Sequence, residues 1–220
     1  MTTTAEPRTQ KGRATRERLL ACARDIAIAN DGHIEIAWVA EAAGVVPSLV
    51  NRYFGSRAGL VSALLDDFFA RLRVEVLDLN LDDLGTWLQH ERIRLEKGVH
   101  FHYTDPAAVV IYTRLSREPR VALTENRHID EIVKHAAANI RRGQKRGELP
   151  SSVDPELAGA AMFGAMQRVM VTALSRTPRP RPDRIVDVLW RQIAAAVEID
   201  PYAETPTPKR RTRSAPATRT

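Results

Sequence analysis

The segment between residues 36 and 54 constrains the fold most strongly, because it predicts two short helices that cross at close range. Ala40 is small enough to leave room for the crossing, and Gly44 can turn the chain between the helices. An Ala-x-x-x-Gly pattern alone fits any helical hairpin, but here the whole segment has the pattern of a helix-turn-helix. The side chains with the spacing to fill the small core beneath both helices are Val39, Ala43, Val45, Val50 and Phe54.

Helical signals continue along the rest of the chain. Apolar residues recur at steps of three and four before Gly32, and Ser56 is a suitable N-cap for a helix that runs through Leu72. An aspartate followed by proline, at Asp105 and again at Asp154, predicts two further helix starts. Other helices are predicted at about 86–98, 123–146, 155–174 and 184–197, and no stretch alternates like a strand. The chain is therefore predicted to be all-α, with about nine helices.

These helices divide the chain into four predicted parts. Residues 1–12 are polar and without periodicity, so we expect a disordered arm, and residues 13–58 form the three-helix head that contains the helix-turn-helix. Residues 59–200 form a larger helical body. Residues 201–220 are rich in Pro, Thr and Arg, which predicts a disordered basic tail.

The formal net charge of +6 favours a polyanionic partner, either DNA or an anionic membrane surface. The single cysteine, Cys22, excludes an intramolecular disulfide and fits a reducing compartment. The N-terminal residues lack the apolar core of a signal peptide, and no stretch approaches the roughly 20 apolar residues of a membrane helix, so we expect a cytoplasmic protein without a membrane partner. The tail supplies +4 of the charge through Lys209, Arg210, Arg211, Arg213 and Arg219 against Glu204.

The head resembles the DNA-binding head of the TetR family of transcriptional regulators over about residues 13–72. The matching motifs are Val39-Ala40, Ala42-Ala43-Gly44-Val45 and the run from Asn51 to Arg57, followed by Leu60. Three positions depart from the usual family pattern: Asn51 replaces a tyrosine, Tyr53 a histidine and Arg57 a lysine. The resemblance implies a homodimeric repressor that binds an inverted repeat in double-stranded operator DNA and responds to a small-molecule effector, which stays unidentified.

The resemblance also assigns roles to residues of the head. Pro47 opens the recognition helix, and Ser48, Leu49 and Arg52 are expected to face the major groove, with Arg52 best suited to a guanine edge. Phosphate contacts position such a head without reading the sequence. They are expected chiefly from Asn51, Tyr53 and Arg57, while Arg13 and Arg16 add backbone or minor-groove contacts.

The body is expected to form the dimer and to hold the effector. In the family the last two helices form a four-helix dimer interface, which here implies Leu157, Ala161, Gly164, Arg168, Val188 and Leu189; alternatively, these side chains only close the core of the monomer. A pocket for a medium-sized, partly apolar effector is expected among Trp87, Glu91, His102, Tyr103, Tyr112, Met162 and Met166. Methionines at helical spacing more often fill a core, so that alternative stays open.

Other classes of protein fit the sequence less well. An enzyme is not expected, because the chain has no glycine-rich phosphate loop, nucleophile elbow or Cys-x-x-Cys pair, and we assign no catalytic residue and no cofactor. Histidine pairs such as His100 with His102 lack a supporting set of ligands, so no metal site is expected. The main alternative is an effector-independent protein that binds DNA with weak or no sequence specificity.

Overall fold

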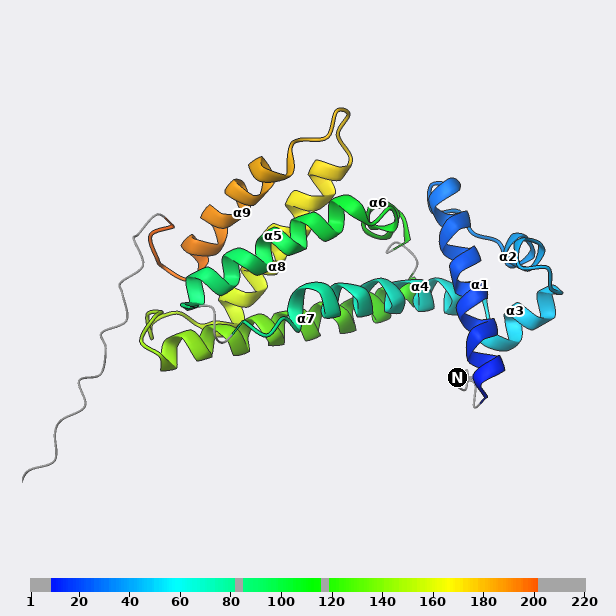
Figure 1. The fold of residues 1–220 in the computed structure, drawn as a ribbon, viewed down its shortest axis with the longest axis horizontal. Helices are drawn as coiled ribbons and strands as arrows, with labels where there is room; N and C mark the ends of the chain where they lie inside the picture. Colours follow the sequence, from blue (N-terminus) through cyan, green and yellow to red (C-terminus); the bar gives the residue numbers. More distant parts are fainter. Residues whose placement is uncertain (1–8, 82–84, 116–118, 202–220) are drawn as a thin grey trace, which may run out of the picture.

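The computed structural model of the protein describes residues 9–81, 85–115 and 119–201. In this part of the chain every regular element is helical, as the sequence predicted. Figure 1 shows a small helical head at one end of an elongated helical body. The elements are α1 (Gln10–Ala29), α2 (Ile36–Ala42), α3 (Pro47–Phe54), α4 (Arg57–Leu72), the π-helix η1 (Arg73–Leu77), α5 (Trp87–Thr104), α6 (Ala107–Thr113), α7 (Pro119–Lys145), α8 (Pro155–Leu174) and α9 (Pro182–Ala196).

The head has the predicted helix-turn-helix. Gly44 lies between α2 and α3 with φ +64°, a conformation that glycine adopts without steric cost. Ala40, at the crossing, is 1% exposed. The predicted core side chains Val39, Val50 and Phe54 are buried, and Ala43 and Val45 pack against them partly buried.

Local capping explains several of the helix boundaries. The Ser56 hydroxyl accepts a hydrogen bond from the Gly59 N–H (3.1 Å) at the start of α4, and Asp154 accepts two from the first turn of α8. Thr9 caps α1 in the same way, so α1 begins at Gln10, inside the segment that the sequence assigned to a disordered arm. The predicted disorder of residues 1–8 and 202–220 lies outside the described residues.

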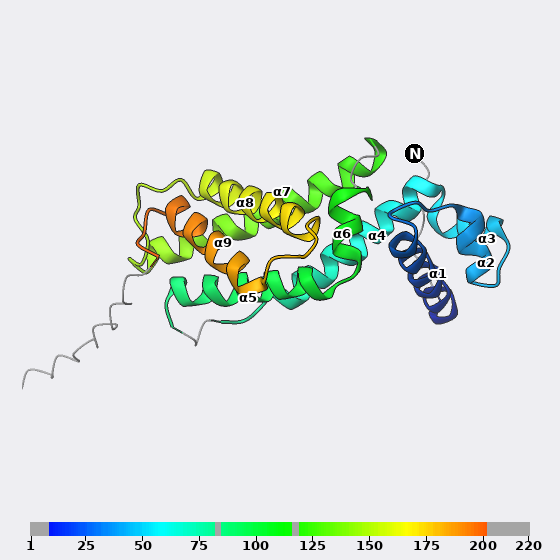
Figure 2. The same ribbon diagram turned by 90° about the horizontal axis from the view of Figure 1, so that it is seen from above.

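Helix α4 connects the head to the body. It leaves the head and runs along α7 into the body, as Figures 1 and 2 show. Helix α8 packs against both α7 and α9, and α9 also packs against α5. The predicted boundary between head and body, after residue 58, therefore falls in the first turn of a helix that belongs to both parts.

Helix α5 is longer than predicted, because the sequence suggested an end at Gly98. The helix continues to Thr104, and Gly98 lies within it where α8 crosses. A Cβ atom at residue 98 would lie only 2.9 Å from Cε of Met166. Gly98 thus lies inside the helix, against the flexible end of the Met166 side chain, and does not end the helix.

Helix α8 corrects the expectation that no stretch approaches a membrane span. It has 20 residues and a mean hydropathy of 1.3, so by length and composition alone it is long and apolar enough to cross a membrane. Only a third of this stretch is buried within the protomer, although α8 packs on α7 and α9. Apolar residues therefore also lie on the outer, unburied face of α8, which is described below.

Candidate nucleic-acid interface and effector site

Helix α3 has one fixed face and one free face. Val50 and Phe54 are 0% and 4% exposed and anchor the helix in the head. On the opposite face Pro47, Ser48, Asn51 and Arg52 are exposed. Since residues at i and i+4 share a face of a helix, Ser48 and Arg52 form one stripe and Pro47 and Asn51 a neighbouring one. These four predicted DNA-contacting residues therefore lie together on a rigid, solvent-facing surface.

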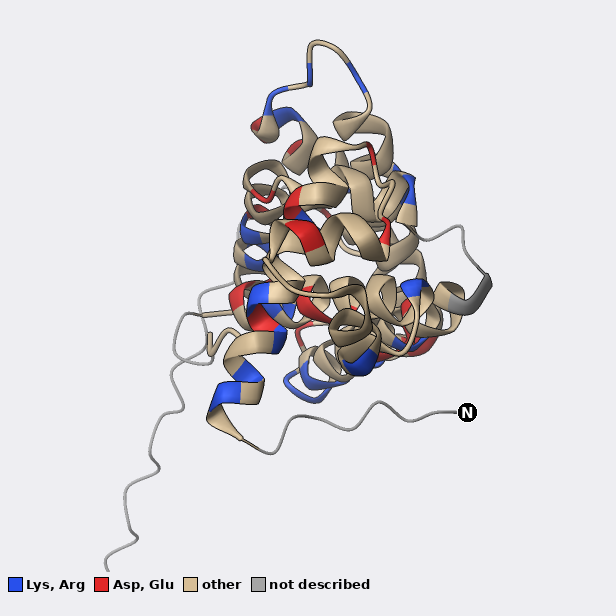
Figure 3. Ribbon diagram, turned by 90° about the vertical axis from the view of Figure 1, so that its right-hand side faces the viewer, with Lys and Arg blue, Asp and Glu red and all other residues tan. Residues whose placement is uncertain are grey.

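Helix α1 contributes basic side chains beside α3. Figure 3, which looks onto this end of the molecule, shows several Lys and Arg positions along the N-terminal half of α1. Arg13 is exposed there. Arg16 is half-buried, and its guanidinium carbon lies 5.4 Å from the centroid of the Phe54 ring, within range of a cation–π interaction. Arg16 thus also helps to hold α1 against α3.

Two residues that the sequence assigned to DNA are only partly available to it. Leu49 and Tyr53 are half-buried on α3, and Tyr53 packs against the core of the head, with its ring centroid 6.5 Å from that of Phe54. Both therefore present an edge and not a whole side chain to an approaching ligand.

Arg57 is engaged within the head. Its Nε donates to the backbone carbonyl of Ile34 at 2.7 Å, across 23 residues of chain. Arg57 lies in the first turn of α4, and Ile34 precedes α2. The bond therefore ties the start of α2 to the helix that leads into the body, a structural role that the phosphate assignment did not include.

The residues predicted to line an effector pocket fall into separate groups along α5. Trp87 lies at its first residue, where the backbone N–H donates to Oε2 of Glu148 at 2.6 Å and the ring packs on Gly143. Trp87 and His102 are 15 residues apart on α5, which separates them by roughly 22 Å. One small cavity cannot include both.

Glu91 belongs to a buried polar cluster between α5 and α7. Its Oε1 lies 2.6 Å from Nη1 of Arg94 and accepts a hydrogen bond from Nδ2 of Asn139 at 3.3 Å. Burial raises the pKa of Glu91, against the opposing effect of Arg94. The carboxyl group is thus committed to contacts within the protein.

His102 and Tyr112 form a second buried pair, between α5 and α6. Nδ1 of His102 lies 2.6 Å from the carbonyl oxygen of Gly98, and Nε2 lies 3.0 Å from Oη of Tyr112. A carbonyl only accepts, so Nδ1 carries the proton and Nε2 accepts from the tyrosine hydroxyl. Burial lowers the pKa of His102, which favours this neutral form, and raises the pKa of Tyr112.

The remaining predicted pocket residues have their own surroundings. The Tyr103 hydroxyl donates to the carbonyl of Pro180 at 2.8 Å, Met162 is buried, and Met166 packs over Gly98. Among the seven, Tyr112 lines a cavity of about 450 Å³ between α6, α7 and α8. Its other walls include Arg114, Glu125, Gln167 and Ser175. The site prediction missed Glu125, Gln167 and Ser175, because they come from α7 and the C-terminal end of α8, whose meeting no local pattern indicates.

The outer face of α8 carries most of the predicted dimer residues. Leu157 is 71% exposed, and Ala161, Gly164 and Arg168 follow it on the same exposed face. A Cβ atom at Gly164 would meet nothing within 4 Å. On α9, Val188 is half-buried, whereas Leu189 is 1% exposed and packs in the core of the protomer. From Leu157 to Gly164, helix α8 thus offers an apolar surface of small residues around one exposed leucine, and the charged Arg168 follows toward its C-terminal end.

Comparison with known proteins gives matches in structure only. No protein-family model matches the chain, and no curated protein matches its sequence. A protein named as a TetR-family transcriptional regulator from Rhodococcus sp. has 23% identity and a TM-score of 0.64, covering 83% of this chain and 98% of its own. NalD, the secondary repressor of the MexAB-OprM multidrug efflux pump in Pseudomonas aeruginosa, has 18% identity and a TM-score of 0.66, with 86% and 98% covered. The transcriptional regulator FadR from Bacillus subtilis, in complex with stearoyl-CoA, has 15% identity and a TM-score of 0.66, with 82% and 97% covered. The chain therefore has the fold of the TetR-family transcriptional regulators, as its sequence resemblance predicted.

Proposed function

We propose that this protein is a sequence-specific DNA-binding transcriptional regulator that represses by occupying operator DNA. The observation that carries the proposal is the division of α3 into a buried face and an exposed face. Val50 and Phe54 fix the helix, so Ser48, Asn51 and Arg52 are held in place for base edges and phosphates. Repressor action is supported by the shared fold with NalD.

The proposed active form is a homodimer. A single helix-turn-helix head contacts few bases, and paired heads bind two half-sites about 34–36 Å apart or a multiple of it. The outer face of α8, with exposed Leu157 among small residues, supports pairing of two copies through this helix. The two-fold symmetry of such a dimer predicts an inverted repeat as the operator.

A small-molecule effector that releases the protein from DNA is the second part of the proposal. The complex of FadR with stearoyl-CoA supports a ligand-binding body in this fold. The effector would favour a conformation in which the two heads no longer match the spacing of the half-sites.

The test is selection of bound fragments from a pool of random double-stranded DNA by the purified protein at near-physiological salt. We expect an enriched inverted repeat. Arg52→Ala should lower affinity for that sequence by about 1–3 kcal/mol and relax the preference at one position. Lys145→Ala is the control, because it removes the same charge from the end of α7 farthest from the head and should change affinity less than about twofold.

The same experiment decides between specific and non-specific binding. Tight, salt-sensitive binding without any enriched sequence would reject the proposal and favour the non-specific alternative. Equal losses for Arg52→Ala and Lys145→Ala would reject α3 as the recognition helix.

A further inference from the structure

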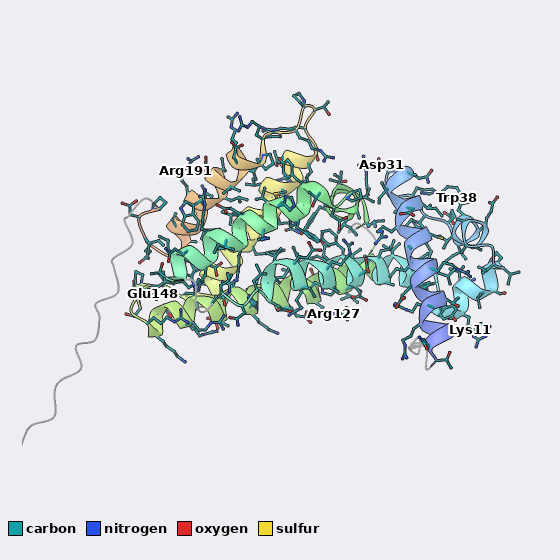
Figure 4. The ribbon with its side chains drawn as sticks, in the orientation of Figure 1. Lys11, Asp31, Trp38, Arg127, Glu148 and Arg191 are labelled. Carbon is teal, nitrogen blue, oxygen red and sulfur yellow. The ribbon has the colours of Figure 1, made fainter. Side chains whose placement is uncertain are left out.

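One ion pair joins the head to the body through residues distant in sequence. Nε and Nη2 of Arg114 lie 2.9 and 2.7 Å from the same oxygen, Oδ2, of Asp31. Arg114 caps the C-terminal end of α6, and Asp31 lies in the turn that follows α1. Figure 4 shows Asp31 on the side of the head that faces the body. The backbones are also close here, since a Cβ atom at Gly32 would lie 2.6 Å from Cβ of Arg114.

Arg114 also lines the cavity of about 450 Å³ between α6, α7 and α8. Arg168 provides a second guanidinium there and Glu125 a carboxylate, so these three charged groups carry a net positive charge when Arg114 is not paired with Asp31. Tyr112 and Val171 add an aromatic ring and an apolar side chain to the wall. In the described part of the chain, the Arg168 guanidinium has no hydrogen-bond or ion-pair partner.

The lining defines a chemical class of ligand. A guanidinium forms paired hydrogen bonds with a carboxylate, and two guanidinium groups against one acid favour a ligand with a single negative charge. Glu125 is an acceptor, so it favours a ligand that also carries a hydroxyl or another donor. An apolar ring can pack on Tyr112 and Val171. Together these groups suit a small aromatic carboxylate with a polar substituent.

We propose that this cavity binds a small carboxylate, and that the carboxylate of the ligand replaces Asp31 as the partner of Arg114. This inference rests on the proposed function only for its effect on DNA. The Arg114 and Asp31 side chains are 48% and 69% exposed, so water and salt weaken their attraction and another carboxylate can compete. Binding then removes one of the contacts that orient the head on the body.

The position of α6 explains how the exchange would be sensed by the rest of the body. Tyr112 lies on the same helix as the contact and is hydrogen-bonded through its hydroxyl to His102 of α5. The His102 and Tyr112 rings are also stacked, with centroids 5.3 Å apart. Helix α6 is thus held by the body core through Tyr112 and by the head through Asp31. A ligand bound to Arg114 would remove the contact with the head and leave the contact with the body core.

The first test measures ligand binding without DNA. The full-length protein is titrated calorimetrically with benzoate and 4-hydroxybenzoate, and with the neutral amides of both as chemical controls. We expect saturable binding of at least one acid, tighter for 4-hydroxybenzoate if Glu125 accepts its hydroxyl, and no binding of the amides. Arg114→Gln should abolish the binding. Absence of saturable binding for both acids, or equal binding of an acid and its amide, would overturn the proposal.

Competition between Asp31 and the ligand makes a sharper prediction, because removing the Asp31 carboxylate must strengthen binding of the ligand to Arg114. Asp31→Asn should raise the affinity for the bound acid several-fold, and asparagine tolerates the positive φ of 49° at this position. Glu41→Gln is the matched control, since it removes one exposed acidic group from the head without touching Arg114. Equal effects of the two substitutions would show a general charge effect and reject the exchange.

The effect of the acid on DNA binding is measured only once an operator has been selected. The bound acid should weaken operator binding by the wild-type protein by about 5- to 150-fold, the usual range of such coupling, and by less in Asp31→Asn, where the contact is already broken. If the acid weakened operator binding as much in Asp31→Asn as in the wild-type protein, the ion pair would have no role in linking the ligand to DNA. Failure to find an operator would count against the proposed function, while the titrations would still decide the site.

Discussion

Arg52 and Arg57 lie close in the chain but have opposite surroundings. Arg52 is exposed on the free face of α3, whereas Nε of Arg57 is bonded to the carbonyl oxygen of Ile34 at 2.7 Å. Ile34 is fully buried, so its carbonyl loses a partner that water would not easily replace if Arg57 were removed. Substitutions at the two positions therefore separate the proposed DNA recognition from the stability of the head.

The expected outcome of Arg57→Ala is a loss of about 1–3 kcal/mol in the free energy of unfolding, the usual cost of leaving a buried acceptor unpaired. Urea denaturation followed by circular dichroism measures it. Arg52→Ala, the control, should change the unfolding free energy by less than about 0.5 kcal/mol. An unchanged stability in Arg57→Ala would show that the bond to Ile34 contributes little.

His102 predicts how stability depends on pH. Burial lowers the pKa of its imidazole in the folded protein, with the Gly98 carbonyl and Asp105 opposing the shift. The unfolded chain then binds more protons in mildly acidic solution, so stability should fall as the pH drops below about 6.5 towards the folded pKa. His102→Gln should make this decline shallower but not abolish it, because burial also lowers the pKa of His135. His100→Gln, at an exposed position, should leave the decline unchanged in urea titrations at several pH values.

At the scale of the helix, the sequence predicted what is encoded locally. Ser56 and Asp154 predicted helix starts correctly because each caps backbone groups of its own helix. The predicted end of α5 was wrong because the helix continues through Gly98, which lies against Met166 of α8 and does not act as a C-cap. The site divides in the same way. The family resemblance identified the exposed face of α3 apart from half-buried Leu49, whereas the cavity beside Tyr112 is formed by three helices whose arrangement depends on tertiary packing.

The outer face of α8 makes a prediction about assembly. Leu157→Glu should convert the protein to a monomer in sedimentation or light-scattering measurements, because an interface would have to bury an unpaired charge. Leu123→Glu is a closely matched control, since Leu123 is 76% exposed on α7 and Leu157 is 71% exposed on α8. If both variants stay dimeric, another surface forms the dimer.

At the scale of the whole molecule, the head is attached to the body by one continuous helix, by apolar packing of α1 on α6 and by charged contacts. Helix α4 provides the continuous connection, and Asp31 with Arg114 provides a lateral one. On α1, Nη1 of Arg24 lies 3.8 Å from Oδ2 of Asp67 on α4. The Asp31–Arg114 pair is exposed, so it holds the head less firmly than the buried packing of α1 on α6 does. Among the contacts between head and body, this exposed ion pair is the one that a competing charged group can replace most easily.

Removal of residues 202–220 tests whether DNA preference belongs to the head or to charge alone. These residues carry a net charge of +4, most of the +6 of the whole chain. Each phosphate contact that a lysine or arginine makes releases counterions, so the truncated protein should bind DNA with a shallower dependence of log K on log salt, by at most about 4. Fluorescence anisotropy on the selected operator and on a scrambled duplex measures both the slope and the preference. The ratio of the two affinities should stay the same, because phosphate contacts act equally on every sequence while α3 reads the bases. A ratio that collapses on truncation would instead place the discrimination in the tail, and the exposed face of α3 would then lose its assigned role.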